Sequence, residues 1–237
     1  MDSTSSPTIM EKVIVFDLDD TLSKEIDYLK SAYREIAQYA AAPCEGCSDG
    51  VSILVEKAYV AMLEAYQRGE NAFEALNAFL GVKNPVSEYL SIYRNHVPDV
   101  RLTDVVRDVL GKLKTEGCVI GLITDGRSVQ QRHKIEALGL SEFMAEEDIV
   151  ISEEFGSEKP SLANYEYFMK RYPEASEFVY VGDNPKKDFI APNALGWTSV
   201  CLKDDSRNIH KQDFSLVAAE ALPKRVIESL GELISVR

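Results

Sequence analysis

The sequence has few cysteines and few histidines. Its 237 residues include 4 cysteines and 3 histidines, and the cysteines are scattered. Four thiols are too few for a disulfide framework in a chain of this size, so we expect them to be reduced. Cys44 and Cys47 have the C-x-x-C spacing of half a zinc site or a redox pair. No second pair follows them, so two thiols in a polar turn are the favoured interpretation, and any role of the pair is left open.

Long apolar runs are also missing. The longest ones, such as 13–16 and 118–123, are far shorter than the roughly 18 residues of a membrane-spanning helix. The first ten residues contain neither a basic region nor an apolar core, so they do not have the pattern of a secretion signal. We therefore expect a cytoplasmic protein without membrane contact.

Basic residues are outnumbered by acidic ones. The chain has 26 Lys and Arg against 39 Asp and Glu, which gives a formal net charge of -13. This charge disfavours binding to nucleic-acid polymers or anionic membranes, and any phosphate ligand must find local cations. The glycine-rich patterns G-x-x-x-x-G-K-[ST] and G-x-G-x-x-G are absent, so a bound nucleotide cofactor is not indicated.

Short β-branched runs alternate with longer amphipathic stretches along most of the chain. Continuous apolar runs of this length are typical of strands that are buried on both faces. The predicted strands are 13–16, 119–123, 149–151, 178–181 and 198–202, and the predicted helices between them are 102–115, 129–138, 162–171 and 187–195. This alternation predicts the α/β class, with a Rossmann-like parallel sheet and helices on both faces.

One segment interrupts the alternation. From 23 to 97 no run resembles a strand, and four helical patterns occur, at 26–39, 51–68, 73–80 and 86–95. We therefore predict an α/β core made of residues 1–22 and 98–237, with an inserted helical cap domain at 23–97. The alternative is a set of extra helices packed on the sheet. A cap is favoured because the insertion follows strand one, at the sheet edge where open α/β sheets bind ligands.

Acidic and polar residues follow three of the predicted strands. Strand one leads into the D-x-D-x-T sequence at 17–21, strand two ends at Thr124, and strand four leads into G-D-x-x-x-x-D at 182–188. Lys159 precedes a predicted helix. Carboxyl ends of parallel strands meet at one edge of the sheet, so these side chains are expected to lie close together. Asp20 and Asp125 are expected to be turn residues or supports for their neighbours.

The order of these four motifs resembles the haloacid dehalogenase superfamily of phosphatases, and the match extends from Val13 to Asp188. A helical cap between the first and second motifs is similar to that of family members with an insertion there. The stretches 151–156 and 126–139 resemble most the branch of pyrimidine 5'-nucleotidases and N-acylneuraminate phosphatases. The resemblance implies an Mg²⁺-dependent phosphomonoester hydrolase that acts on a small phosphorylated metabolite, a nucleoside monophosphate or a sugar phosphate.

The resemblance also implies catalytic roles. Asp17 would attack phosphorus and form an aspartyl-phosphate, and Asp19 would act as general acid and then general base. Thr124 and Lys159 would stabilise charge on the transferring oxygens.

A divalent cation is expected on electrostatic grounds as well. Four carboxylates at one sheet edge repel one another and raise each other's pKa unless a cation neutralises them, and oxygen-only ligands favour Mg²⁺. By resemblance, its ligands are the Asp17 carboxylate, the Asp19 backbone carbonyl and the Asp183 carboxylate. Asp188 would hold Lys159 or a water molecule on the metal.

Several other functions fit parts of the pattern. A phosphomutase of the β-phosphoglucomutase type has the same four motifs. A non-catalytic phospho-ligand-binding protein of this fold is the other alternative, and it is disfavoured because every motif is intact. Dehalogenases of the superfamily lack the second aspartate of the first motif, here Asp19, so dehalogenation is disfavoured. The identity of the metabolite, the cap residues that contact it and the choice between monomer and homodimer are left open.

Overall fold

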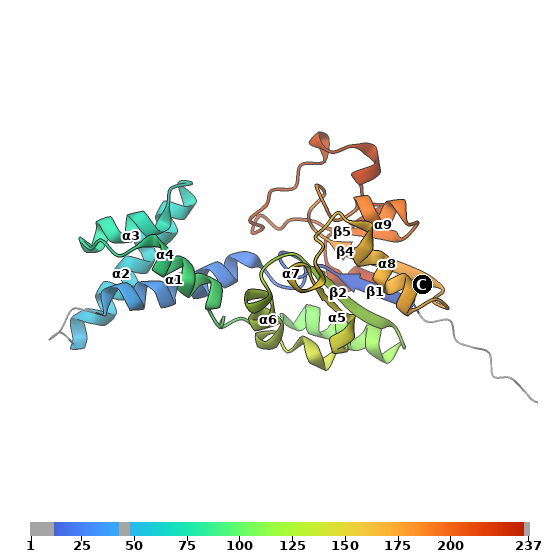
Figure 1. Ribbon diagram of the computed structural model, residues 1–237, viewed down its shortest axis with the longest axis horizontal. Coiled ribbons are helices and arrows are strands. Elements are labelled where there is room, and N and C mark those ends of the chain that lie inside the picture. The colour runs from blue at the N-terminus through green and yellow to red at the C-terminus, as the bar shows by residue number, and fades with distance from the viewer. Residues whose placement is uncertain (1–11, 43–47, 235–237) are drawn as a thin grey trace, which may run out of the picture. The chain divides into compact units, whose positions relative to one another are not determined.

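The computed structural model describes residues 12–42 and 48–234 (Figure 1). The C-x-x-C pair Cys44 and Cys47 and the first ten residues lie outside these ranges. The described chain divides into two compact units. The first, which we call the core unit, contains the residues up to Lys24, Arg101–Ser128 and those from Gly139 onward. The second, the helical unit, contains Glu25–Val100 and Val129–Leu138.

The core unit is built on a six-stranded sheet in which every neighbouring pair is parallel. The strand order is β3-β2-β1-β4-β5-β6. The strands are β1 (Lys12–Phe16), β2 (Val119–Thr124), β3 (Ile149–Ile151), β4 (Glu177–Gly182), β5 (Thr198–Leu202) and β6 (Arg225–Ile227). The α/β fold class and the five expected strands are confirmed, and β6 is an addition that the sequence pattern did not indicate.

The order of the strands reverses beside β1. β2 and β3 extend the sheet on one side of β1, whereas β4, β5 and β6 extend it on the other. Phe16 pairs with Leu122 of β2 and with Val181 of β4, so the three strands end at the same edge. An open α/β sheet binds its ligand at such a reversal, beyond the carboxyl ends of the strands.

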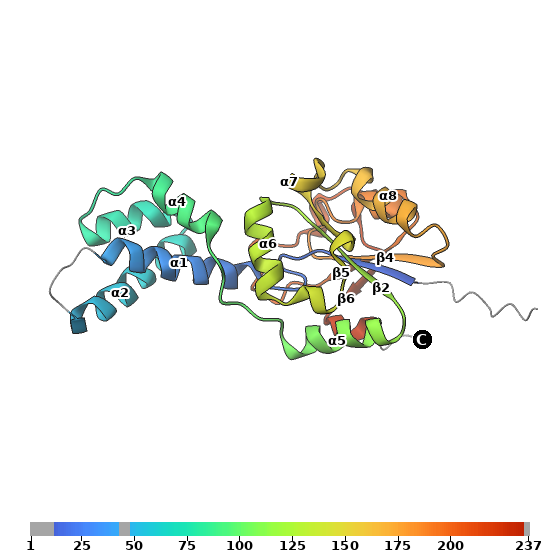
Figure 2. The ribbon, with the colours of Figure 1, turned by 60° about the horizontal axis from the view of Figure 1, so that its bottom comes forward.

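Helices of the core unit cover both faces of this sheet. α5 (Asp104–Thr115) lies on one face, and α8 (Leu162–Arg171) and α9 (Ile190–Ala194) lie on the other (Figures 1 and 2). α9 is shorter than the predicted helix 187–195, because residues 184–188 form a tight turn in which Asp188 N–H donates to the Asn184 carbonyl. A short helix, α7 (Ser152–Phe155), follows β3 directly. Five short 3₁₀ helices complete the described chain: η1 (Leu140–Glu142), η2 (Glu146–Asp148), η3 (Phe214–Leu216), η4 (Ala219–Ala221) and η5 (Leu230–Leu233).

Aromatic side chains fill the space between the sheet and α8. Tyr165 packs edge-on against Tyr180 and Trp197, and Trp197 stacks on Phe178 with ring centroids 4.9 Å apart. Gly121 makes room for Phe168, since a β-carbon there would overlap the phenyl ring. This packing fixes β4, whose far end carries the candidate site.

The helical unit has an aromatic core of its own. It contains α1 (Glu25–Ala41), α2 (Ser48–Gln67), α3 (Ala72–Leu80) and α4 (Val86–Asn95), together with most of α6 (Ser128–Ala137). Its helices agree closely with those expected between 23 and 97. Edge-to-face contacts join Tyr28 to Tyr93 and Tyr33 to Phe73. None of the helices that the structure describes is long and apolar enough to span a membrane.

Candidate active site

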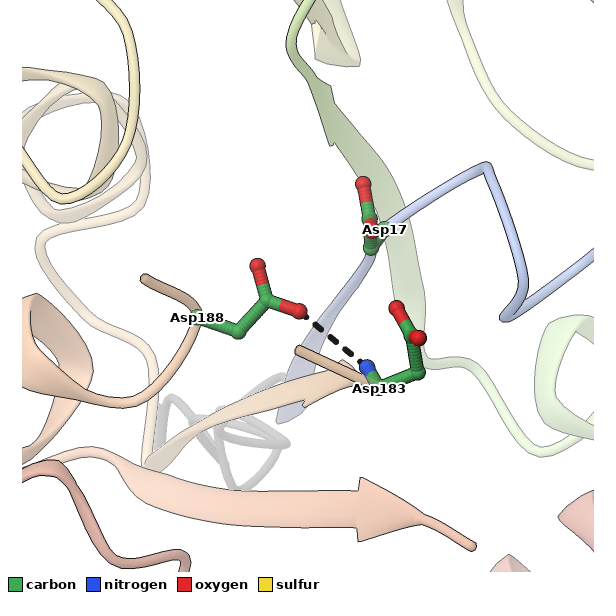
Figure 3. Close-up of side chains that lie close together, drawn as sticks. All are labelled: Asp17, Asp183 and Asp188. Atoms are coloured by element: carbon green, nitrogen blue, oxygen red, sulfur yellow. Dashed lines mark hydrogen bonds between the residues drawn. The ribbon is translucent and has the colours of Figure 1, made fainter. Parts of the chain in front are cut away.

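Three buried carboxylates meet at the carboxyl edge of the sheet (Figure 3). Asp17 directly follows β1, Asp183 directly follows β4, and Asp188 lies at the end of the turn after β4. One oxygen from each side chain lies within 4.8 Å of those of the other two. The sheet order explains this convergence, because β1 and β4 are neighbours at the reversal point.

Lys159 joins two of these carboxylates. Its Nζ lies 2.7 Å from Asp17 Oδ1 and 2.9 Å from Asp188 Oδ1, and 3.2 Å from the hydroxyl of Tyr180. The lysine side chain is fully buried. A buried ammonium is stable only when it is paired, so Lys159 and the two aspartates are mutually dependent.

Asp188 is also held by the backbone. Its Oδ2 accepts hydrogen bonds from the N–H groups of Asp183 (3.1 Å) and Asn184 (2.8 Å), so it ties the start of the turn to its end (Figure 3). This carboxylate lies directly against Gly182, where a β-carbon would be 2.5 Å from Asp188 Oδ2 and 2.8 Å from its Cγ. Position 182 therefore requires glycine.

We predict that Gly182→Ala destabilises the protein by about 1–3 kcal/mol, the usual cost of overpacking, and lowers activity by displacing Asp188 from Lys159. Gly111→Ala is the matched control, because an added β-carbon on α5 meets nothing within 4 Å. Alanine at that helical position should leave stability unchanged or raise it. Urea unfolding of both variants tests the prediction, and equal stability of the two would contradict it.

Burial dominates the electrostatics of the site. Desolvation raises the pKa of Asp17 from 3.8 to about 7, with Lys159 opposing the shift and Asp188 adding to it. Desolvation, followed by the charges of Asp17, Asp188 and Asp20, raises the pKa of Asp183 to about 9. Burial alone would lower the pKa of Lys159, but Asp17 and Asp188 raise it well above 10.5, so the lysine stays charged.

The donor set fits a hard divalent cation. The three carboxylates offer only oxygen ligands, which suits Mg²⁺ rather than a soft metal. Lys159 is shared between Asp17 and Asp188, whereas the side chain of Asp183 accepts from a neutral amide, Asn208 Nδ2, at 2.9 Å. The raised pKa of Asp183 shows that ionising it without a cation is costly.

Thr124 and Asp19, the two remaining predicted site residues, lie in different environments. Thr124 ends β2 and is buried, and its hydroxyl has no hydrogen-bond partner within the described ranges. Such an orphaned buried hydroxyl is costly unless a ligand satisfies it. Asp19 is half-buried, and its backbone pairs with Ser23 in a short parallel bridge. Among the described residues it does not belong to the three-carboxylate group.

Asp125 connects three of the loops around the site. Its Oδ1 accepts from the Lys159 backbone N–H at 3.0 Å, and its Oδ2 pairs with Lys187 Nζ at 2.9 Å. The loops after β2 and β4 are thereby tied to the segment that carries Lys159. Lys187 was not among the predicted site residues, although a pair of lysines at 186–187 beside Asp188 is a visible signal in an acidic chain. Asn208 was not predicted either, and no sequence motif marks it.

Comparison with known proteins agrees with this geometry. Residues 14–202 match the family model described as haloacid dehalogenase-like hydrolase. A glyceraldehyde 3-phosphate phosphatase from Methanocaldococcus jannaschii is 30% identical over 237 residues, which cover 96% of this chain and 97% of that protein. The pyrimidine 5'-nucleotidase YjjG from Escherichia coli is 34% identical over 73 residues, which cover 30% of this chain and 32% of that protein.

A solved structure shares the fold. The magnesium-bound HAD-hydrolase YfnB from Bacillus subtilis matches with a TM-score of 0.62 and 19% identity, covering 94% of this chain and 97% of that one.

The family expected from the four motifs is confirmed, since the family model spans all of them from Asp17 to Asp188. The chain therefore belongs to the haloacid dehalogenase-like hydrolases and is a phosphatase of that family, a phosphoric monoester hydrolase.

Proposed function

We propose that the protein hydrolyses a small phosphate monoester in an Mg²⁺-dependent reaction that passes through an aspartyl-phosphate on Asp17. The observation that carries the proposal is the buried group of Asp17, Asp183 and Asp188 around Lys159 at the sheet's reversal point. Asp17, the Asp19 backbone carbonyl and Asp183 would hold the cation, and Asp188 would keep Lys159 in place. Bound Mg²⁺ would neutralise charge on the phosphoryl oxygens.

The first half-reaction belongs to Asp17 and Asp19. An Asp17 carboxylate oxygen attacks phosphorus in line, and the bond from phosphorus to the ester oxygen breaks. Asp19 gives its proton to the leaving alkoxide, which departs as the alcohol. Asp19 suits this exchange because its side chain is half-buried and lies outside the three-carboxylate group.

The second half-reaction releases phosphate. Asp19, now ionised, takes a proton from water, and the resulting hydroxide attacks phosphorus and breaks its bond to Asp17. The Lys159 ammonium and the Thr124 hydroxyl lie on neighbouring motifs and would stabilise the charged oxygens in both steps. The Thr124 hydroxyl has no hydrogen-bond partner within the described chain, so it is available to donate to a phosphoryl oxygen.

A small sugar phosphate is the proposed substrate class, with pyrimidine nucleoside monophosphates as the next class to test. A relative that covers nearly the whole chain is named a glyceraldehyde 3-phosphate phosphatase, whereas the nucleotidase match covers 30% of the chain. We further propose that the helical insertion at 23–97 acts as a cap, that phosphorylated macromolecules are poor substrates, and that the enzyme works in the cytoplasm. The acidic net charge of -13 agrees with a substrate that is not a nucleic-acid polymer.

A panel of phosphate monoesters tests the proposal. Phosphate release should be fastest from glyceraldehyde 3-phosphate or another short sugar phosphate and slower from nucleoside monophosphates. Phosphoryl movement between hydroxyls of one sugar, without release of phosphate, would identify a mutase instead. Absence of release from every ester, with the ligands still bound, would indicate a non-catalytic binding protein.

Metal dependence gives two expected results: turnover should require Mg²⁺, and the stabilisation by Mg²⁺ should depend on pH. Chelation by EDTA should abolish turnover, and Mg²⁺ should restore it. In the metal-free protein the folded-state pKa values of Asp17 and Asp183, about 7 and about 9, lie above the ordinary aspartate value of 3.8. Their contribution to stability is therefore fully present below about pH 4 and is lost as the pH rises through those values.

Mg²⁺ binds the ionised carboxylates and so competes with protons. The increase in melting temperature on adding Mg²⁺ should consequently be larger near pH 8.5 than near pH 5.5. Thermal unfolding with and without Mg²⁺ at both pH values measures this difference. An equal increase at the two pH values, or full turnover after complete chelation, would count against metal binding at these carboxylates.

A further inference from the structure

The segment after β5 reaches back to the carboxylate site. Asn208 Nδ2 donates to Asp183 Oδ2 at 2.9 Å, and Gln212 Nε2 donates to the Asp183 backbone carbonyl at 2.8 Å. The Ile209 N–H donates to Asp20 Oδ2 at 2.9 Å. Residues 203–213, which have no regular secondary structure, are thus fastened to both the first and the fourth motif.

Asn208 bonds in two directions at once. Its amide nitrogen donates to Asp183, and its amide oxygen accepts from Lys24 Nζ at 2.6 Å. Lys24 is also ion-paired with Asp205 Oδ1 at 3.0 Å, and it is the last residue of the core unit before α1. A carboxamide can make both bonds at once, because it carries an amide donor for a carboxylate and a carbonyl acceptor for an ammonium.

The neutrality of this donor matters for a metal ligand. A lysine or arginine beside Asp183 would neutralise the carboxylate and compete with a bound cation. An amide fixes one carboxylate oxygen without removing negative charge from the site. Lys24 polarises the amide from its far side and so strengthens the hydrogen bond to Asp183.

We propose that Asn208 is a positioning residue that orients Asp183 for Mg²⁺ and that Lys24 holds Asn208 in the required rotamer. The proposal rests on the proposed function, because it assumes that Asp183 is a metal ligand. It assigns a role to a residue outside the four motifs. It also connects Asp183 to the point at which the chain leaves the core unit for α1.

Mg²⁺ titration of the metal-free protein by calorimetry tests this role. Asn208→Leu is close in shape but removes both hydrogen bonds, and it should weaken Mg²⁺ binding about 10- to 100-fold, the usual effect of losing a residue that orients a metal ligand. Its turnover should be low at limiting Mg²⁺ and should recover as Mg²⁺ is raised. Asn208→Gln keeps the carboxamide one methylene further out and should recover part of the affinity.

Lys211→Ala is the matched control, since Lys211 is exposed and lies in the same segment. It should bind Mg²⁺ as the original protein does. A purely structural role for Asn208 would lower the melting temperature in EDTA without changing the Mg²⁺ dissociation constant, and that result would overturn the proposal. If Asn208→Leu does not fold, Asn208→Ala gives the same comparison with less steric demand.

The two proposals fail in different ways. If the unaltered protein binds no Mg²⁺, the metal requirement of the proposed function is wrong. If it binds Mg²⁺ and the Asn208 variants bind it equally well, only the positioning role is wrong.

Discussion

Replacing Asp17 with asparagine is expected to lower turnover by at least about 10⁴-fold while leaving the protein folded. An amide oxygen is a poor nucleophile, so no covalent intermediate can form. The fold should tolerate the change because asparagine has nearly the same shape and Lys159 keeps Asp188 as its partner at 2.9 Å. Steady-state kinetics together with circular dichroism and thermal unfolding measure the two effects separately.

Asp108→Asn is the matched control, because Asp108 is an exposed aspartate on α5. It should leave turnover unchanged. Near-normal phosphate release by the Asp17 variant would refute the nucleophilic role.

Asp19→Asn offers a complementary test. With an activated leaving group this variant should still form the phosphorylated enzyme, which then accumulates because its hydrolysis lacks a general base.

The sheet was predictable because its strands are buried on both faces and therefore appear in the sequence as continuous apolar runs. The five predicted strands differ from β1 to β5 by at most a residue or so at each end. β6 was missed because Arg225 and Ile227 flank a single valine in a run of three residues, directly after Pro223 and Lys224. Such a short edge strand is specified by its pairing with β5 rather than by its own pattern.

The site was predictable to the extent that topology alone determines it. Residues placed directly after neighbouring parallel strands must meet at one edge, as Asp17 and Asp183 do. Asn208 was not predictable in this way, because it reaches the site from a loop whose path depends on tertiary contacts. Loop conformation carries no periodic signal, so such residues become visible only in three dimensions.

The organisation of the helical insertion was also only partly predictable from the sequence. Its four helices follow from 3.6-residue periodicity, but the assignment of α6 to the same compact unit does not. α6 comes after β2 in the chain, and its residues Lys134 and His133 contact Tyr28 and the backbone of His96. Contacts between segments that are about a hundred residues apart, such as Tyr28 and Lys134, leave no trace in local patterning.

Replacing Lys159 with methionine is expected to cause the largest loss of stability among the site variants. The ammonium is fully buried and lies within 2.9 Å of two carboxylates, so its removal leaves buried negative charge without a partner. Breaking a buried pair in this way costs about 3–5 kcal/mol. Turnover should be lost as well, because Lys159 would no longer stabilise the transferring oxygens.

The loss of stability should depend on pH in a defined direction. Desolvation already raises the pKa of Asp17 to about 7, and Lys159 is the largest opposing influence, so its removal raises that pKa further. A carboxyl with a raised folded-state pKa contributes its stability at low pH and loses it as the pH rises through that value. The deficit of the variant should therefore be smaller near pH 5 than near pH 8. Lys170→Met, which removes an exposed lysine 3.7 Å from Glu166 on α8, is the control and should change stability little at either pH. Urea unfolding of the metal-free proteins measures the difference, and a deficit that shrinks with rising pH would show that Lys159 is not the charge that compensates Asp17.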